Sequence, residues 1–279
     1  MTDKSINTEK DLQTLAMVQE ALDKGRVKVY YQPQFRAADC KLVSAEALCR
    51  IENNYSEIIM PSDFIPVLEK QESPDVIKNF DWYIFTKVCR FLERMKRKGL
   101  RLIPISVNLS RRHLISDPSE LYITTTANLW NIPHKYLGVE ITESAAEENP
   151  LELQRLIYKI RLQGFKVAID DFGTGNANFK FLIDNQADII KLDRSFISHG
   201  CSDPRQQIVL ANVIHMSKML GMTVVAEGVE EVEQWNFLTD HGCDLIQGFF
   251  AAEPLTEDEF IDFYHCATGD IRHDADDRE

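Results

Sequence analysis

The sequence lacks the features that mark secreted and membrane proteins. No apolar run approaches the roughly 20 residues that a membrane-spanning helix needs. The polar N-terminus, MTDKSINTEKD, contains no hydrophobic core of a signal peptide. The six cysteines form no CxxC pair and show no regular spacing, so we interpret them as reduced, mostly buried thiols. We therefore expect a cytoplasmic protein without a membrane segment.

Basic side chains are also scarce. The 31 Lys and Arg residues are outnumbered by 44 Asp and Glu residues, which gives a formal net charge of -13. Because duplex nucleic acids are bound through phosphate contacts to basic side chains, this balance argues against a duplex nucleic-acid binder. It leaves open a small anionic ligand whose charge is met locally by metal and a few basic groups. None of the seven histidines stands at ligand spacing from another.

The sequence does contain a repeated order of apolar run, polar residue and helical pattern. Strands are predicted at 27–35, 42–50, 102–109, 137–144, 167–171, 187–193, 223–227 and 244–250. No Pro/Gly/Ser-rich linker interrupts them, and 279 residues suffice for a (β/α)8 barrel, which needs about 250. This order predicts a single α/β domain built as a closed eight-stranded barrel.

Two adjacent carboxylates, Asp170 and Asp171, end the buried strand VAIDD. They repel each other, and a divalent cation would neutralise them most directly. Taken alone, the segment fits equally well a strand end whose acids cap the next helix. A second ambiguity concerns Glu46 and Arg50, which share a face of their strand. They form either a simple ion pair or a metal ligand beside a clamp for phosphate or guanine.

The carboxyl ends of the strands in such a barrel converge on one mouth. The polar residues expected there are Glu46, Asn108, Glu140, Asp170, Asp171, Lys191, Glu227 and Gln247. Oxygen ligands without thiolates suit Mg²⁺ or Mn²⁺ better than Zn²⁺. Five acids exceed what one hard cation usually takes, and two metals about 3.5–4 Å apart suit in-line attack on a phosphoryl centre. A lysine among the acids can orient or help deprotonate the attacking water.

With these residues in place, the chain resembles the EAL-domain phosphodiesterases, which hydrolyse cyclic di-GMP. Glu46-Ala47-Leu48 followed by Arg50 is the motif that names the family. The segments YYQP, SVNLS, EITES, DDFGTG, KLDRSF, AEGVE and QGF also occur in the family's order. Each is weak alone, but together they are specific, and they cover about Leu12 to Tyr264.

The resemblance implies a role for each matched residue. The implied metal ligands are Glu46, Asn108, Glu140, Asp170, Asp171 and Glu227, and they would hold two Mg²⁺ or Mn²⁺ ions, with Ca²⁺ inhibitory. The implied catalytic residues are Glu46, Asp171, Lys191 and Glu227. The implied substrate contacts are Gln32, Leu48, Arg50, Asn108, Asp193 and Gln247. Glu143 would anchor the mobile loop that follows Asp171.

The resemblance also implies a modified TIM barrel whose first strand is antiparallel, and a homodimer with a possible regulatory partner. We expect a polar segment at 1–11, the EAL domain at 12–266 and a charged, disordered tail at 267–279. The chain departs from the family at Asn176-Ala177-Asn178, where Tyr-Ser-Ser is common. This change supports a second hypothesis, a cyclic di-GMP receptor without efficient turnover. A third hypothesis, independent of the loop, is a metal-dependent barrel enzyme for another phosphodiester.

Overall fold

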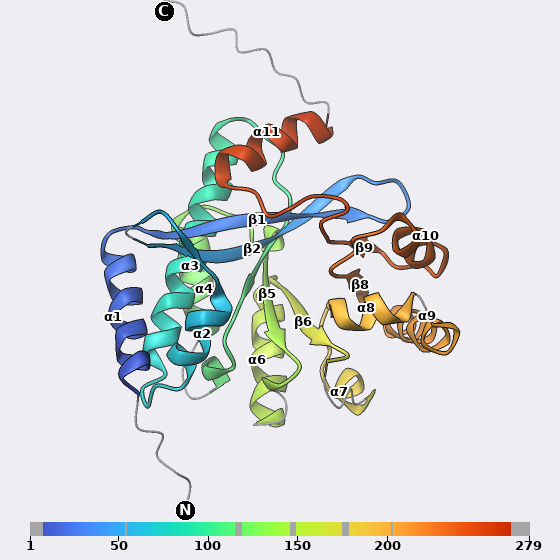
Figure 1. Ribbon diagram of the computed structural model, residues 1–279, viewed down its shortest axis with the longest axis horizontal. Helices are drawn as coiled ribbons and strands as arrows, with labels where there is room; N and C mark the ends of the chain where they lie inside the picture. Colours follow the sequence, from blue (N-terminus) through green and yellow to red (C-terminus); the bar gives the residue numbers. More distant parts are fainter. Residues whose placement is uncertain are drawn as a thin grey trace, which may run out of the picture.

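The computed structural model describes residues 8–53, 55–114, 119–145, 149–174, 179–201 and 203–268. Its strands form one sheet in the order β1-β9-β8-β7-β6-β5-β4-β2-β3, and β1 also pairs with β2, so eight strands close into a barrel (Figure 1). The strands are β1 (Val27–Arg36), β2 (Leu42–Glu52), β3 (Ile58–Ile59), β4 (Ile105–Asn108), β5 (Leu137–Thr142), β6 (Lys166–Phe172), β7 (Ile189–Leu192), β8 (Thr223–Ala226) and β9 (Leu245–Ile246).

Strand β1 runs antiparallel to both of its neighbours, β2 and β9, whereas β2 and β4 to β9 pair in parallel. This confirms the predicted modified (β/α)8 barrel. Because proline cannot donate to a ladder, the sequence predicts Pro33 at a strand end or edge, but it lies inside β1. The backbone N of Pro33 points to the edge of β1 that faces β9. On that edge Tyr31 forms an isolated bridge with Leu255, and Phe35 pairs with Ile246 of β9. Pro33 lies between these two pairings, so its lack of an N–H group costs no hydrogen bond of the sheet.

Helices surround the barrel, and two of them begin at the cap residues that the sequence indicates, whereas α2 begins at Pro61, before the Ser62 that was expected to cap it. Asn149 accepts a hydrogen bond from Glu152 N, with Pro150 at the first helical position, and Asp203 caps the helix that starts at Pro204. The α-helices are α1 (Glu9–Asp23), α2 (Pro61–Glu69), α3 (Asp75–Arg97), α4 (Ser119–Leu129), α6 (Pro150–Leu162), α7 (Phe179–Asp184), α8 (Arg194–Gly200), α9 (Pro204–Met219), α10 (Val232–Asp240) and α11 (Glu257–Thr268). Short 3₁₀ helices are η1 (Arg111–Leu114) and η2 (His134–Tyr136). No described helix is both long and apolar enough to cross a membrane.

Four other elements differ from the predictions. The sequence predicts a helix from about Asp81 to Lys98, but α3 begins at Asp75, and helices α4 and α8 were not predicted. Strand β9 has two residues instead of the seven predicted at 244–250. After β9 the chain leaves the sheet, and Gly248 packs directly against the backbone of Val229.

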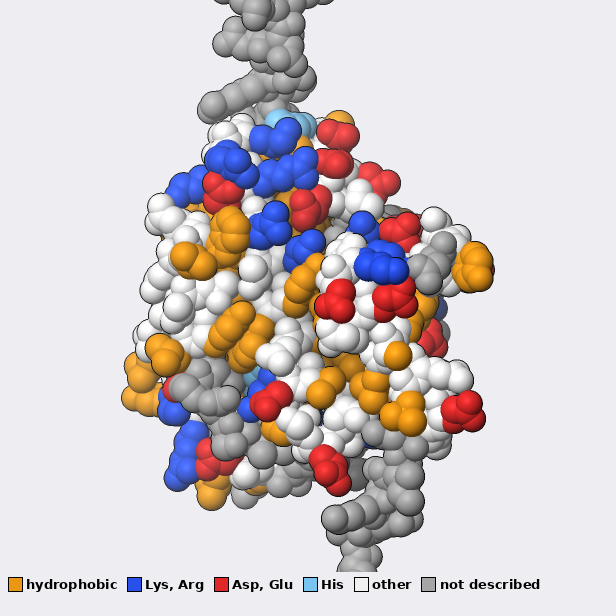
Figure 2. Space-filling model, turned by 90° about the vertical axis from the view of Figure 1, so that its left-hand side faces the viewer, with side chains coloured by type: hydrophobic (Ala, Val, Ile, Leu, Met, Phe, Trp, Pro, Cys, Tyr) orange, Lys and Arg blue, Asp and Glu red, His pale blue; other side chains and the backbone are white. Residues whose placement is uncertain are grey.

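Helices α3 and α11 cover β1. The Tyr31 ring of β1 stacks on Phe91 of α3 with 4.1 Å between centroids, and Phe260 of α11 lies 5.8 Å from the same ring. Lys and Arg side chains gather toward α11 on one face of the molecule (Figure 2). Arg94, in the basic last turn of α3, forms an ion pair with Glu257 of α11 at 3.1 Å and a second with Asp258. The contact suits both helices, since it sets cations at a C-terminus and acids at an N-terminus.

Candidate functional site

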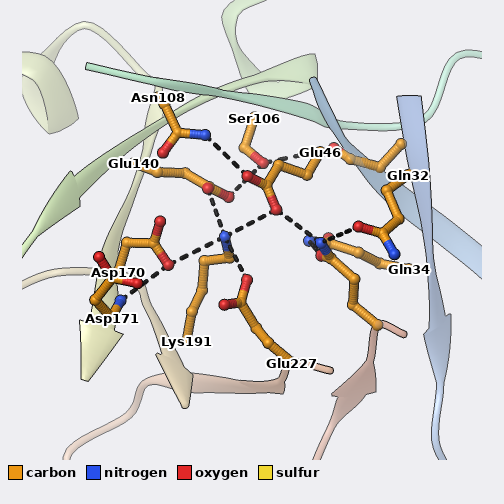
Figure 3. Close-up of polar contacts among 12 residues, drawn as sticks. Gln32, Gln34, Glu46, Ser106, Asn108, Glu140, Asp170, Asp171, Lys191 and Glu227 are labelled. Carbon is orange, nitrogen blue, oxygen red and sulfur yellow. Dashed lines mark hydrogen bonds and ion pairs between the residues drawn. The ribbon is translucent and has the colours of Figure 1, made fainter. Parts of the chain in front are cut away.

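The carboxyl ends of the parallel strands bring acidic side chains together inside the mouth of the barrel (Figure 3). Glu46 of β2, Glu140 of β5 and Asp170 of β6 are all buried. One carboxylate oxygen from each lies within 4.8 Å of the other two. The two-residue period of a strand aims all three inward, as predicted. This buried acidic cluster has the oxygen donors and the spacing that suit a hard divalent cation.

Lys191 of β7 lies at the centre of this cluster. Its ammonium nitrogen is 2.6 Å from Glu140, 3.0 Å from Glu46 and 3.2 Å from Asp170. A fourth carboxylate, that of Glu227 just after β8, lies 2.6 Å away. Four anions around one buried cation outweigh burial, which alone would lower the lysine pKa, so the pKa of Lys191 stands well above its usual value. The lysine is therefore a fixed positive charge.

The pKa values of the carboxylates around Lys191 are shifted in different directions. Burial and then the neighbouring Glu46 charge raise the pKa of Glu140 well above its usual value. Burial also raises the pKa of Asp170, and it raises that of Glu227 to about 8. Burial acts on Glu46 in the same direction, but Lys191 and the hydrogen bonds that Glu46 accepts hold its pKa below the usual value. One lysine cannot neutralise four acids, so the site favours an additional cation.

Amide side chains hold Glu46 in place. Gln247 donates to Glu46 Oε2 at 2.7 Å and Asn108 donates to Glu46 Oε1 at 2.8 Å. Gln247 also donates to Gln32 at 3.0 Å and accepts from Gln34 at 2.7 Å. Gln34 lies two residues after Gln32 and therefore shares its face of the strand, but the family resemblance assigned it no role. The missing information was the pairing of β1 with β9, which sets these amides side by side.

Ser106 is a second residue that sequence reasoning did not single out. Its hydroxyl donates to Glu140 at 2.6 Å, from a position two residues before Asn108 on β4. The sequence could have indicated Ser106, because residues two apart on a strand share a face and Asn108 was expected to point inward.

Asp171 adopts a left-handed backbone conformation, with φ of 58°. Its amide donates to Asp170 Oδ1 at 2.9 Å, so the turn between the two acids is held by the first of them. Few non-glycine residues adopt this conformation, and it places Asp171 beside the cluster instead of on the outer face of β6. Burial and the neighbouring Asp170 raise the pKa of Asp171 to about 6.

A cavity of about 340 Å³ opens over the cluster. Predicted residues that line it are Gln32, Glu46, Leu48, Asp170, Asp171, Lys191, Glu227 and Gln247, and Arg194 and Phe249 add walls that were not predicted. A more apolar cavity of about 370 Å³ lies on the other side of Leu48, between β2, α2 and α3. Asn108 and Leu48 border this second cavity, so the two spaces adjoin at the mouth.

Other predicted residues lie at the rim or farther away. Arg50 is half-buried and donates to Cys49 O at 2.7 Å, while Glu46 pairs with Lys191, so the simple ion pair of Glu46 with Arg50 is not formed. Asp193 accepts from Ser195 N at 2.8 Å at the start of α8. The amide of Glu143 donates to Asp170 O at 3.0 Å, which ties the end of β5 to β6. The loop residues Asn176-Ala177-Asn178 lie outside the described part of the chain.

Comparison with known proteins decides the family. The family model described as "EAL domain" matches residues 15–254. This chain belongs to the EAL-domain family. It is 33% identical over 244 residues to the oxygen sensor protein DosP of Escherichia coli, and this match covers 88% of the chain and 30% of DosP. It is 28% identical over 253 residues to the cyclic di-GMP phosphodiesterase RocR of Pseudomonas aeruginosa, covering 91% of the chain and 64% of RocR.

Solved EAL-domain structures share the fold. The structure described as the PaMucR phosphodiesterase in complex with c-di-GMP superposes with a TM-score of 0.82 at 27% identity, covering 89% of the chain and 99% of that structure. The chain spans only about a third of DosP and less than two thirds of RocR, so these EAL proteins contain further regions. The likeness therefore concerns the barrel and its mouth.

Proposed function

We propose that this EAL domain is a metal-dependent phosphodiesterase that hydrolyses cyclic di-GMP to linear pGpG. The observation that carries the proposal is the buried cluster of Glu46, Glu140 and Asp170 around Lys191, in a family that includes named cyclic di-GMP phosphodiesterases. Their excess negative charge and oxygen donors fit Mg²⁺ or Mn²⁺, with Ca²⁺ binding but inhibiting.

The residues divide into two ligand groups in this proposal. Glu46, Asn108, Glu140 and Asp170 would hold one ion, and Asp170, Asp171 and Glu227 would hold a second. When bound, the ions supply an activated water and neutralise charge on the phosphoryl oxygens.

Side chains of the chain itself then handle the water and its proton. Lys191 orients the attacking water from within the cluster, since its ammonium is fixed by four carboxylates. Glu227 is the candidate base, because its carboxylate lies 2.6 Å from the Lys191 ammonium and so beside the water that Lys191 would orient. Gln247 keeps Glu46 oriented through its 2.7 Å hydrogen bond.

The two adjoining cavities suit a ligand with two bases. A phosphodiester would lie over the acidic cluster, in contact with Gln32 and Gln247, while Leu48 separates the two spaces. Arg50 would pair with a phosphate, which its planar guanidinium can bind through two hydrogen bonds. Asp193 would contact the substrate from the start of α8, and Glu143 would anchor the loop that follows Asp171.

We place this activity in the bacterial cytoplasm, in second-messenger signalling, with residues 12–266 as the EAL domain. We further propose a homodimer, which a regulatory partner can control. Sedimentation of the purified chain tests the dimer.

The test of the function is incubation of the purified chain with cyclic di-GMP and Mg²⁺ or Mn²⁺, followed by chromatography. We expect pGpG, and we expect its formation to stop on addition of EDTA or Ca²⁺. Glu46→Ala should lower turnover at least about 1000-fold, because it removes a metal ligand held by three hydrogen-bonding partners. Glu52→Ala is the matched control, since Glu52 is a partly exposed glutamate at the far end of the same strand.

The outcome separates the competing hypotheses. Tight binding of cyclic di-GMP by calorimetry without any pGpG would contradict the hydrolase and support a receptor. Turnover of other phosphodiesters in preference to cyclic di-GMP would support an enzyme of different specificity.

A further inference from the structure

A third cavity, of about 300 Å³, lies inside the barrel on the opposite side of the acidic cluster from the mouth. Its lining includes Arg36 and Lys166, which are exposed at the amino ends of the parallel strands. Its lining also includes Glu140 and Lys191, which are buried and belong to the cluster. The cavity therefore connects the surface at the closed end of the barrel with the underside of the site.

Small side chains at several lining positions leave room for the cavity, whose wall also includes Ile105, Ile189 and Leu245. Four of its lining residues lie two residues before Glu46, Asn108, Glu140 and Lys191 on their strands, a spacing of about 6.6 Å. The register pairs Ile189 with Thr223 and Ser106 with Gly138. Barrels usually fill such layers with bulky branched residues. Four positions lining this cavity instead carry hydroxyl side chains or none: Ser44, Ser106, Gly138 and Thr223.

Polar groups continue along the cavity from its lower end to the cluster. The Ser44 hydroxyl donates to Gln34 at 2.7 Å, and Gln34 donates to Gln247 at 2.7 Å. Higher up, the Ser106 hydroxyl donates to Glu140 at 2.6 Å. A wholly apolar cavity stays dry, whereas a cavity of this volume that has polar groups in its wall has room and partners for ordered water.

We propose that this cavity is a water passage, which supplies the site from the closed end of the barrel while substrate covers the mouth. The inference rests on the proposed hydrolysis, which consumes one water in each turnover. The water oxygen bonds to phosphorus, the ribose oxygen leaves, and that oxygen takes up a proton. Since a cyclic dinucleotide at the mouth covers the cluster, replacement water enters from below.

Thiol labelling tests the passage without relying on turnover. Ser44→Cys places a thiol on the wall, and methyl methanethiosulfonate labelling of its peptide is followed by mass spectrometry. We expect the labelling rate to stay within twofold when cyclic di-GMP and Ca²⁺ occupy the mouth. Adding Thr223→Phe, which fills the lower end, should lower the rate at least tenfold. Thr223→Val, of nearly unchanged volume, is the control and should label normally.

Filling the cavity with Thr223→Phe should also slow the reaction itself. In the otherwise unchanged chain, Thr223→Phe should lower kcat for cyclic di-GMP at least tenfold and leave its Kd in Ca²⁺ unchanged, because the substitution lies below the cluster. Ile189→Phe fills the same layer and replaces Thr223→Phe if that variant does not fold. Circular dichroism establishes folding in each case.

The results separate this proposal from the proposed function. Normal labelling of Ser44→Cys in both plugged variants, or protection by ligand at the mouth alone, would overturn the passage. Unchanged kcat in a plugged variant that blocks labelling would overturn its supply of water. If the unmodified chain makes no pGpG while the labelling pattern holds, the passage exists and the proposed hydrolysis fails.

Discussion

At the scale of single residues, Lys191 neutralises part of the charge that four carboxylates place inside the barrel. The pattern of polar residues at strand ends predicted which acids meet at the mouth. It could not predict that the lysine ammonium lies within 3.2 Å of all four. That arrangement depends on the stagger between strands that are far apart in the chain, which local sequence does not encode. The left-handed conformation of Asp171 was equally invisible, since aspartate only rarely adopts it.

Replacing Lys191 should destabilise the metal-free chain. Lys191→Met leaves the buried carboxylates without their common cation, and breaking such a buried network lowers the free energy of unfolding by about 3–5 kcal/mol. We expect this loss in urea unfolding at pH 8 with EDTA, and a smaller loss with Mn²⁺, which supplies replacement charge. Lys166→Met is the control, because its ion pair with Asp188 is more than half exposed on the lysine side and should change stability by less than about 1 kcal/mol. Equal losses in the two variants would contradict the central role of Lys191.

Metal binding should release protons near neutral pH. The pKa of Glu227 is raised from 4.5 to about 8 and that of Asp171 from 3.8 to about 6, so the folded chain keeps protons there that the unfolded chain has lost. Their favourable contribution to folding is complete below the unfolded values and is lost as pH rises through the folded values. Because a metal needs deprotonated carboxylates, its apparent affinity should rise from pH 6 to 8 and then level off.

Calorimetry of Mn²⁺ binding in two buffers of different ionisation enthalpy measures these protons directly. Glu227→Gln should flatten the rise between pH 7 and 8. Affinity that is constant from pH 6 to 9 would contradict the assignment of Glu227 to the metal site.

At the scale of elements, the strands were predicted more accurately than the helices. Because side chains alternate between the two faces of a strand, the sequence indicated which of them face the barrel axis. Helix α4 was missed because SELYITTTANL contains one isoleucine and three threonines, and these β-branched residues have low helix propensity. Helix α8 has only seven residues, too few for a clear periodic pattern.

The contact between the loops after β8 and β9 is an element-scale feature that mutation can test. A Cβ atom at Gly248 would lie only 2.1 Å from Val229 O, so Gly248→Ala must push the two loops apart. These loops carry Glu227 and Gln247. We expect the free energy of unfolding to fall by about 2–4 kcal/mol and kcat to fall at least tenfold.

Gly25→Ala is the control for the change from glycine to alanine. A Cβ atom at Gly25 meets nothing within 4 Å, so only the cost of its positive φ, about 1 kcal/mol, should remain. A loss no larger than that at Gly248 would contradict the tight contact with Val229.

At the scale of the whole molecule, the barrel extends beyond the segment that the family model matches. That match ends at residue 254, whereas α11 buries Phe260, Ile261 and Tyr264 and packs on Tyr31 of β1. Phe260→Ala should therefore lower the free energy of unfolding by about 3–5 kcal/mol, as in other buried cores. Thermal unfolding measures the loss. Phe249→Ala, which truncates an exposed phenylalanine, is the control for fold stability.

The cavity below the acidic cluster also bears on how the protein responds to hydrostatic pressure. Pressure favours unfolding in proportion to the empty internal volume that unfolding removes. A passage already filled with exchangeable water contributes little to that volume, because its contents have nearly the density of bulk solvent. The barrel should then resist compression better than its 300 Å³ of internal space suggests. Filling that space with a phenylalanine ring should leave the volume change of unfolding nearly the same.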